Sequence, residues 1–283
     1  MTLRQLTLST SWGNLVLAGG SRAGEGTLIL LPQLRLALDP GRPHRSLPPM
    51  STVTVSHGHM DHLAGLGYWA SQRFLNSMGP ATLLAPAAIA SEIEALLQLY
   101  SRLEGGHPYQ VAAIAVEDGS HHSLRRDLEL SFFATDHWVP TLGVALVWTT
   151  QRLRPELAGL PSAEIAARRL TGEEVTAPHR VPVLTYCADT GVGVLRERPT
   201  MLAAEVVLLE CSFFKPADRA RAATYGHLHL EDLLDHVGDL QCRHLVILHA
   251  SRRHRVREVE ELLERHLRPR LAASLHHMIL DWD

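Results

Sequence analysis

Short apolar runs alternate with longer segments of helical periodicity along the whole chain. The strand-like runs crowd the first third, where glycine or proline bounds each of them. They comprise residues 15–20, 27–32, 35–41 and 51–57. Apolar positions then recur at helical spacing near 65–78 and over 87–103, and the second segment starts just after Pro86. This mixture predicts an α/β protein in which helices cover the faces of β-sheets.

The same alternation continues to the end of the chain. Further strands are predicted at 81–85, 110–116, 128–135, 143–149, 181–187, 205–209, 244–248 and 276–283, and further helices at 230–239 and 255–266. A polar stretch over 151–180 has neither pattern and is predicted to be a connection. Since no repeat or low-complexity segment interrupts the chain, we expect residues 1–283 to form a single domain.

Composition limits the class of protein. The chain has 283 residues, 46% hydrophobic and 20% charged, which is typical of a globular protein. No apolar run reaches the ~18 residues of a membrane span and no secretory signal is evident, so we expect a cytoplasmic protein without a membrane partner. The three cysteines are too far apart for a metal knuckle. A net charge of −3 means that any polyanion must be bound locally.

Three histidines and one aspartate lie within the segment SHGHMDH, as His57, His59, Asp61 and His62. Side chains two positions apart share a face of a strand, so His57 and His59 can point the same way as the preceding strand ends. Asp61 and His62 fall where the next helix would begin, and their side chains diverge toward separate targets. The pattern predicts two neighbouring metal ions, one for each pair.

Four residues cannot complete two coordination spheres, and three further candidates stand at the ends of apolar runs. These are His137, Asp189 and His249. The carboxyl ends of strands form the edge where α/β folds build their sites. The natural division is His57, His59 and His137 on one ion, Asp61, His62 and His249 on the other, and Asp189 between both. Mixed nitrogen and oxygen ligation suits two zinc ions, with manganese or iron as alternatives.

Several motifs between about 36 and 263 together resemble the ribonuclease Z family of the metallo-β-lactamase fold superfamily, in its short, plant-like form. They are LALDPGR, SHGHMDHLAGL, ATDHWVPTLG, ADTG, LLECSFF, YGHLHLEDLLDH and LHASRRH. The resemblance implies an αββα sandwich of two mixed sheets flanked by helices, a homodimer, and cleavage of the 3′ trailer from precursor tRNA. The chain departs from the family at Ala188, where glycine is usual, and over 151–180, where the tRNA-binding arm is shortened.

The resemblance also implies roles in phosphodiester hydrolysis, where paired divalent ions activate a water and stabilise charge. Asp61 would accept the proton of the water as general base, while His227, steered by Glu210, would donate a proton to the departing 3′-oxygen. His229 more plausibly caps the following helix. Arg253, in the run SRRHRVR, either binds a phosphate or belongs to a solvated helix start.

Two other functions fit parts of the sequence. A generic or small-molecule phosphodiesterase would keep the chemistry, and the short arm and mildly acidic balance favour it. A metal-stabilised binding subunit without turnover would keep only the fold. The second alternative is disfavoured, because the chain retains all seven ligand candidates together with His227.

Overall fold

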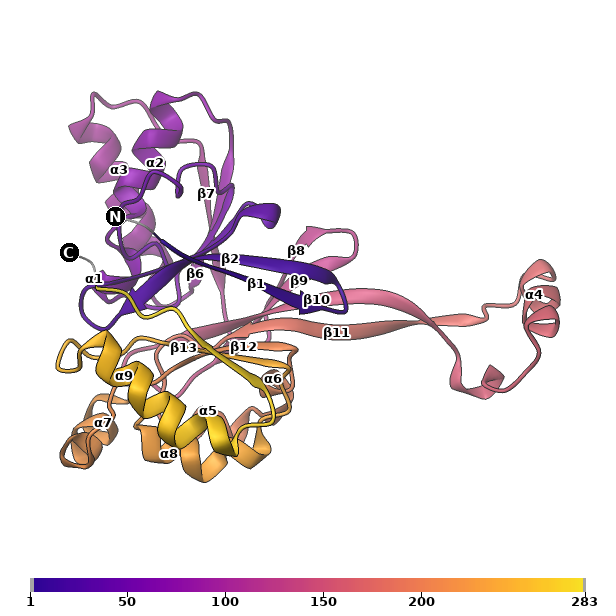
Figure 1. Ribbon diagram of the computed structural model, residues 1–283. Coiled ribbons are helices and arrows are strands. Elements are labelled where there is room, and N and C mark those ends of the chain that lie inside the picture. The colour runs from indigo at the N-terminus through magenta and orange to yellow at the C-terminus, as the bar shows by residue number, and fades with distance from the viewer. Residues whose placement is uncertain (1–2, 282–283) are drawn as a thin grey trace.

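Two mixed seven-stranded sheets pack face to face in the computed structural model, which describes residues 3–281 (Figure 1). The first sheet contains β1 (Arg4–Thr10), β2 (Gly13–Arg22), β3 (Gly26–Leu31), β4 (Leu36–Leu38), β5 (Thr52–Thr54), β6 (Ala81–Pro86) and β7 (Val111–Val116), in that order. The second contains β14 (Ser274–His277), β13 (His244–Leu248), β12 (Val206–Glu210), β11 (Thr176–Tyr186), β10 (Leu142–Leu153), β9 (Leu128–Ala134) and β8 (His121–Arg125). Each sheet joins an antiparallel half to a parallel half.

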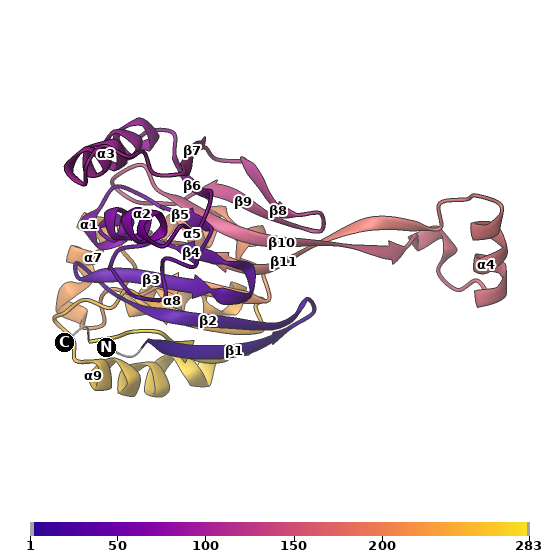
Figure 2. The same cartoon turned by 90° about the horizontal axis from the view of Figure 1, so that it is seen from above.

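Helices cover the outer face of each sheet, which completes the αββα sandwich expected from the sequence (Figures 1 and 2). On the first sheet lie α1 (Met60–Leu63), α2 (Leu66–Leu75) and α3 (Ala90–Leu103). On the second lie α5 (Gly193–Glu197), α6 (Pro199–Leu202), α7 (Arg219–Tyr225), α8 (Leu230–His236) and α9 (Val256–Leu262). None of the described helices is long and apolar enough to cross a bilayer.

Strand β3 shows why the apolar runs of the sequence are continuous. Ile29 and Leu31 belong to the core between the two sheets, whereas Leu28 and Leu30 pack toward the helices on the outside. Successive side chains of a strand point to opposite faces, so a strand that is buried on both faces must be apolar at every position. All six residues of β3 are buried.

Some sequence predictions of elements were wrong at the periphery. The edge strands β1 and β8 were not predicted, because their side chains are mostly exposed and polar residues interrupt the pattern. The predicted helix over 255–266 is α9 followed by a π-helical turn, Leu263–Leu267. The last strand lies at β14 rather than over 276–283, and residues 282–283 of that prediction lie outside the described residues.

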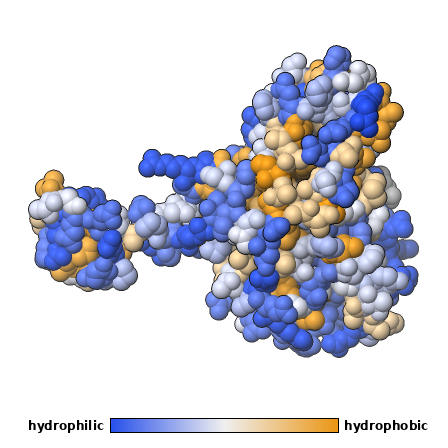
Figure 3. Space-filling model, turned by 180° about the vertical axis from the view of Figure 1, so that it is seen from behind, coloured by the Kyte–Doolittle hydropathy of each residue, from blue (hydrophilic) through white to orange (hydrophobic). Residues whose placement is uncertain are grey.

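The stretch 151–180 forms an arm rather than a simple connection. Trp148 is the last residue of β10 that pairs with β9, and from there the strand continues to Leu153 paired only with β11. At the tip lies α4 (Ser162–Leu170), and the whole arm stands clear of the body (Figures 2 and 3). The polar sequence did not predict these strands, because they bury few apolar side chains. The backbone hydrogen bonds between β10 and β11 hold them together instead.

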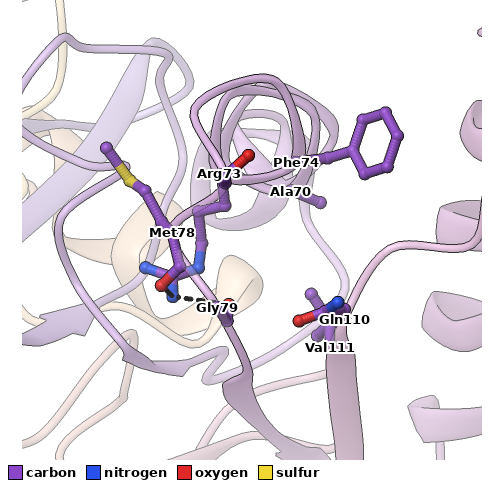
Figure 4. Close-up of a pocket in the computed structure, with 8 residues that line it drawn as sticks. Ala70, Arg73, Phe74, Met78, Gly79, Gln110 and Val111 are labelled. Atoms are coloured by element: carbon purple, nitrogen blue, oxygen red, sulfur yellow. Dashed lines mark hydrogen bonds between the residues drawn. The ribbon is translucent and has the colours of Figure 1, made fainter.

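A buried arginine ties the end of α2 to its surroundings. Arg73 has a 4% exposed side chain and donates hydrogen bonds to five backbone carbonyl groups. Those groups belong to Pro48, Met50, Met78, Gly79 and Pro80. Figure 4 shows Arg73 beside Met78 and Gly79 in a pocket that contains none of the predicted site residues. The pocket therefore belongs to the scaffold of the first sheet.

The loop after β4 and helix α1 touch through their backbones. Gly65 N donates to the carbonyl oxygen of Pro40 at 2.7 Å. A Cβ atom added to Gly41 would lie 1.8 Å from the carbonyl oxygen of Asp61. Since this neighbour is backbone and cannot swing away, glycine is required, and the contact fixes where Asp61 sits.

We expect Gly41→Ala to lower the free energy of unfolding by about 1–3 kcal/mol, because the backbone at Asp61 must shift to admit the methyl group. Denaturant-induced unfolding measures this change. Gly238→Ala is the matched control, since a Cβ at Gly238 meets nothing within 4 Å. Equal stability of the two variants would contradict the close approach.

Candidate metal centre

The seven predicted ligands come together at one edge of the sandwich. The first four follow β5 in the loop that enters α1 and in α1 itself. His137, Asp189 and His249 follow β9, β11 and β13. The strand ends therefore deliver residues that lie up to 192 positions apart, from His57 to His249, into one pocket.

The first group consists of His57, His59, His137 and Asp189. One ligand atom from each lies within 4.8 Å of all the others. His57 Nε2 is 2.9 Å from His59 Nδ1 and 3.8 Å from Asp189 Oδ2. His137 Nε2 is buried and has no hydrogen-bond partner among the described residues. An orphaned imidazole nitrogen facing a carboxylate and two further imidazoles fits a metal ligand.

The second group consists of Asp61, His62 and His249, with ligand atoms again within 4.8 Å of one another. His62 Nε2 is 3.3 Å from His249 Nε2, and Asp61 Oδ2 is 3.4 Å from that same nitrogen. Both histidines are almost fully buried. The residues thus separate into the two sets that the sequence suggested.

Asp189 lies between the two groups. Its Oδ2 atom faces His57, whereas Oδ1 lies 3.3 Å from His62 Nε2 and 3.4 Å from His249 Nε2. The side chain is 3% exposed. A carboxylate with one oxygen toward each group has the geometry of a bridging ligand.

The ring nitrogens that face away from the centre are held by hydrogen bonds. Their partners are Ser56 Oγ for His57 (2.9 Å), Asp39 Oδ2 for His62 (2.8 Å), Gly226 O for His137 (2.9 Å) and Ser212 Oγ for His249 (3.2 Å). Such outer contacts fix the orientation of each ring and leave the inner nitrogen free to coordinate. The residues therefore fit a pair of divalent ions.

Burial keeps several of these imidazoles neutral. Burial and the neighbouring His62 lower the pKa of His57 to about 2. Burial also lowers the pKa of His59 and of His137. Burial alone would raise the pKa of Asp61, but its hydrogen bond with His249 and the charge of His62 outweigh that effect and lower it. Neutral imidazoles and ionised carboxylates are the forms that bind metal.

Asp39 contacts the second group and was not predicted from the sequence. Its carboxylate is fully buried and accepts hydrogen bonds from Ser56 N (2.7 Å), Ser56 Oγ (2.7 Å) and Tyr186 Oη (2.5 Å), besides contacting His62. Asp39 follows the apolar run of β4, at the same edge as the ligands. An acidic residue directly after a buried strand was the signal that could have identified it.

Three residues beside the centre have left-handed backbone conformations. The φ angles are 52° at Asp39, 53° at Ala188 and 61° at His249. The angle at Ala188 explains why glycine is usual in this position, since a Cβ is disfavoured there. Strain of this kind costs about 1–3 kcal/mol per residue and is retained where the surroundings enforce it.

His227 was not among the predicted ligands, yet one of its ring nitrogens lies within 4.8 Å of ligand atoms of Asp189 and His249. Its Nδ1 is 2.7 Å from Glu210 Oε1, and its ring centroid lies 5.1 Å from that of His137 and 5.5 Å from that of His249. Burial would lower the pKa of His227, but the charge of Glu210 and its hydrogen bond more than offset this and raise the pKa to about 9. A protonated imidazole at a site edge can donate a proton.

Glu210 is itself fixed in place. It is 1% exposed, and its oxygens accept hydrogen bonds from Thr190 N at 2.8 Å and Ser212 Oγ at 2.7 Å. His229, by contrast, caps α8, since its side chain accepts a hydrogen bond from Glu231 N. Arg253 is exposed in the turn that follows His249. The structure thus brings His227 and Glu210 to the centre, while Arg253 lies on the surface.

Comparisons with known proteins agree with this arrangement. The family described as "Beta-lactamase superfamily domain" matches residues 23–250. The chain is 29% identical to tRNase Z TRZ1 of Arabidopsis thaliana over 247 residues, covering 86% of this chain and 88% of the relative. It is 30% identical to the nuclear ribonuclease Z of Triticum aestivum over 158 residues, covering 56% and 89%. The fold is similar to that of the metallo-beta-lactamase fold protein YhfI from Bacillus subtilis, with a TM-score of 0.62, 14% identity, and coverage of 91% and 93%.

We expect Asp39→Asn to weaken metal binding about 10- to 100-fold, because His62 loses the charged partner that orients its ring. Competition with a chromogenic chelator measures the affinity. Asp239→Asn is the matched control, since that carboxylate is 70% exposed and pairs only with His236 among the described residues. Unchanged affinity in Asp39→Asn would show that His62 is oriented without it.

Proposed function

The chain belongs to the beta-lactamase superfamily and, within it, to the ribonuclease Z family, and on this basis we propose that it is an endoribonuclease that removes the 3′ trailer of precursor tRNA. Family membership makes the chain a metal-dependent hydrolase. The single observation that carries the nuclease proposal is the His227–Glu210 pair beside the two ligand groups. Glu210 holds the outer nitrogen of His227, so that the ring presents its other nitrogen to the centre.

We propose that the two groups hold two zinc ions, with manganese or iron as alternatives. His57, His59 and His137 would hold one ion, Asp61, His62 and His249 the other, and Asp189 both. Ions bound in this way activate a water and offset the charge that develops on a phosphoryl group. The nitrogen-rich donor set, five imidazoles and two carboxylates, supports zinc.

The side chains of the protein would move the protons of the reaction. Asp61 Oδ2 is held by a hydrogen bond from Gly24 N at 2.7 Å and lies at the inner face of the centre, where it can accept the proton of the attacking water. His227, kept protonated by Glu210, would pass a proton to the 3′-oxygen that leaves. Glu210 acts through His227 and is a positioning residue.

The arm provides a second surface for a folded RNA. Residues 151–180 contain five arginines and four glutamates. Arg154 lies 3.4 Å from Glu174 and Arg168 lies 2.9 Å from Glu164, so part of this positive charge is neutralised within the arm. These ion pairs support the second candidate, a phosphodiesterase with small or generic substrates.

The two candidates differ in what the purified protein cuts. We expect a precursor tRNA with a 3′ extension to be cleaved after the discriminator nucleotide in the presence of zinc or manganese, leaving a 3′-hydroxyl on the tRNA. Gel analysis of labelled precursor measures the product, and a chelator should abolish it. Hydrolysis of bis(p-nitrophenyl) phosphate without any cut in the precursor would contradict the tRNA proposal and favour the alternative.

His227→Ala should lower the rate of precursor cleavage about 10²- to 10⁴-fold, because the 3′-oxygen is a poor leaving group without a proton. The same variant should lose much less on bis(p-nitrophenyl) phosphate, whose leaving group is only weakly basic. Glu210→Gln should show the same split in milder form. Metal analysis should find both variants fully loaded, and His236→Ala is the control. Equal losses on both substrates would exclude the donor role.

A further inference from the structure

A large aromatic side chain is exposed directly beside the metal centre. Trp138 follows His137 and is 66% exposed. Its ring centroid lies 5.2 Å from that of His59, at an angle of 40°, and 6.2 Å from that of His137. One side of the indole thus rests near the imidazoles, and most of the side chain remains accessible to solvent.

The backbone around Trp138 is held firmly. His137 Nδ1 contacts Gly226 O, and a Cβ at Gly226 would lie only 3.2 Å from Trp138 N. This close approach places the end of α7 against the Trp138 segment. Tyr225, the last residue of α7, is 46% exposed, and the guanidinium of Arg221 lies 5.1 Å from the centre of its ring. The backbone at the end of α7 therefore supports the segment that carries Trp138.

A hollow of about 360 Å³ lies next to the same loop. His137 and Val139, the two neighbours of Trp138, are among its lining residues, and most of its walls are apolar. Glu117 also lines it and its carboxylate repels phosphate, whereas the nearby Asp118 is paired with Arg198 at 2.9 Å. The hollow is therefore better suited to the flat, uncharged part of a nucleotide than to its backbone.

We propose that Trp138 is a stacking platform for an unpaired nucleobase next to the scissile phosphate, an inference that rests on the proposed ribonuclease activity. Every base presents a π-face, so stacking on an aromatic ring binds single-stranded RNA without strong sequence preference. A cationic ligand is disfavoured at this position, because the adjoining ligand groups would hold two divalent ions. A base stacked on Trp138 would hold the neighbouring scissile phosphate at the metal centre.

The expected effect follows from the strength of base stacking. Trp138→Ala should lower kcat/KM for precursor cleavage about 5- to 100-fold, whereas Trp138→Phe, which keeps a ring, should retain most of the activity. In a precursor with an abasic nucleotide on one side or the other of the scissile bond, the difference between wild type and Trp138→Ala should disappear. Leu103→Ala, at a 75% exposed apolar residue of α3, is the matched control.

A binding measurement separates this inference from the proposed function. The metal-loaded protein should lose tryptophan fluorescence when it binds a precursor with a non-hydrolysable scissile linkage, and Trp138→Phe should lose much less of the signal. Quenching at Trp138 without cleavage of the natural precursor would overturn the proposed function and leave the platform standing. Cleavage that Trp138→Ala does not slow, or a difference between wild type and Trp138→Ala that persists on both abasic precursors, would overturn the platform.

Discussion

The rest of the structure depends on the close contact of imidazole nitrogens and carboxylate oxygens in the buried centre. His62 Nε2 and His249 Nε2 face each other at 3.3 Å, and His57 Nε2 faces His59 Nδ1 at 2.9 Å. Burial lowers the pKa of His57, His59 and His137, and His137 Nε2 has no hydrogen-bond partner among the described residues. Imidazole nitrogens and carboxylate oxygens gathered this closely form the kind of donor set that binds divalent metal.

The two halves of the sandwich hold this arrangement jointly. Asp39, from the end of β4 in the first sheet, accepts a hydrogen bond from Tyr186 of β11 in the second sheet and orients His62 between them. Asp189 then contacts residues of both ligand groups. Because the same few buried side chains connect the sheets and aim the ligands, the packing of the core and the geometry of the centre depend on each other.

The sequence predicted the sandwich and the gathering of seven histidine and aspartate residues at one edge, because both depend on regular features. Apolar runs mark strands that are buried on both faces, and a ligand directly after such a run must lie at the strand edge. Asp39 and Ser56 were not identified, because a single polar residue after a strand has many structural explanations. The resemblance implied a shortened arm over 151–180, but its strands and α4 were not predicted, because they bury few side chains. The homodimer and the cytoplasmic location stay predictions, since they concern more than one chain or its surroundings.

The projecting arm has a consequence for the order in which products depart. From Thr149 to Leu153 the β10 strand runs beyond the sheet, which is roughly 16 Å at about 3.3 Å per residue, and α4 lies farther out. A folded RNA can touch the arm and the centre at once, whereas a short trailer touches only the centre. Under the proposed activity, the trailer would keep one contact after the cut, at the centre, and the tRNA body would keep two. The trailer should dissociate first, so that release of the mature RNA limits turnover whenever chemistry is fast.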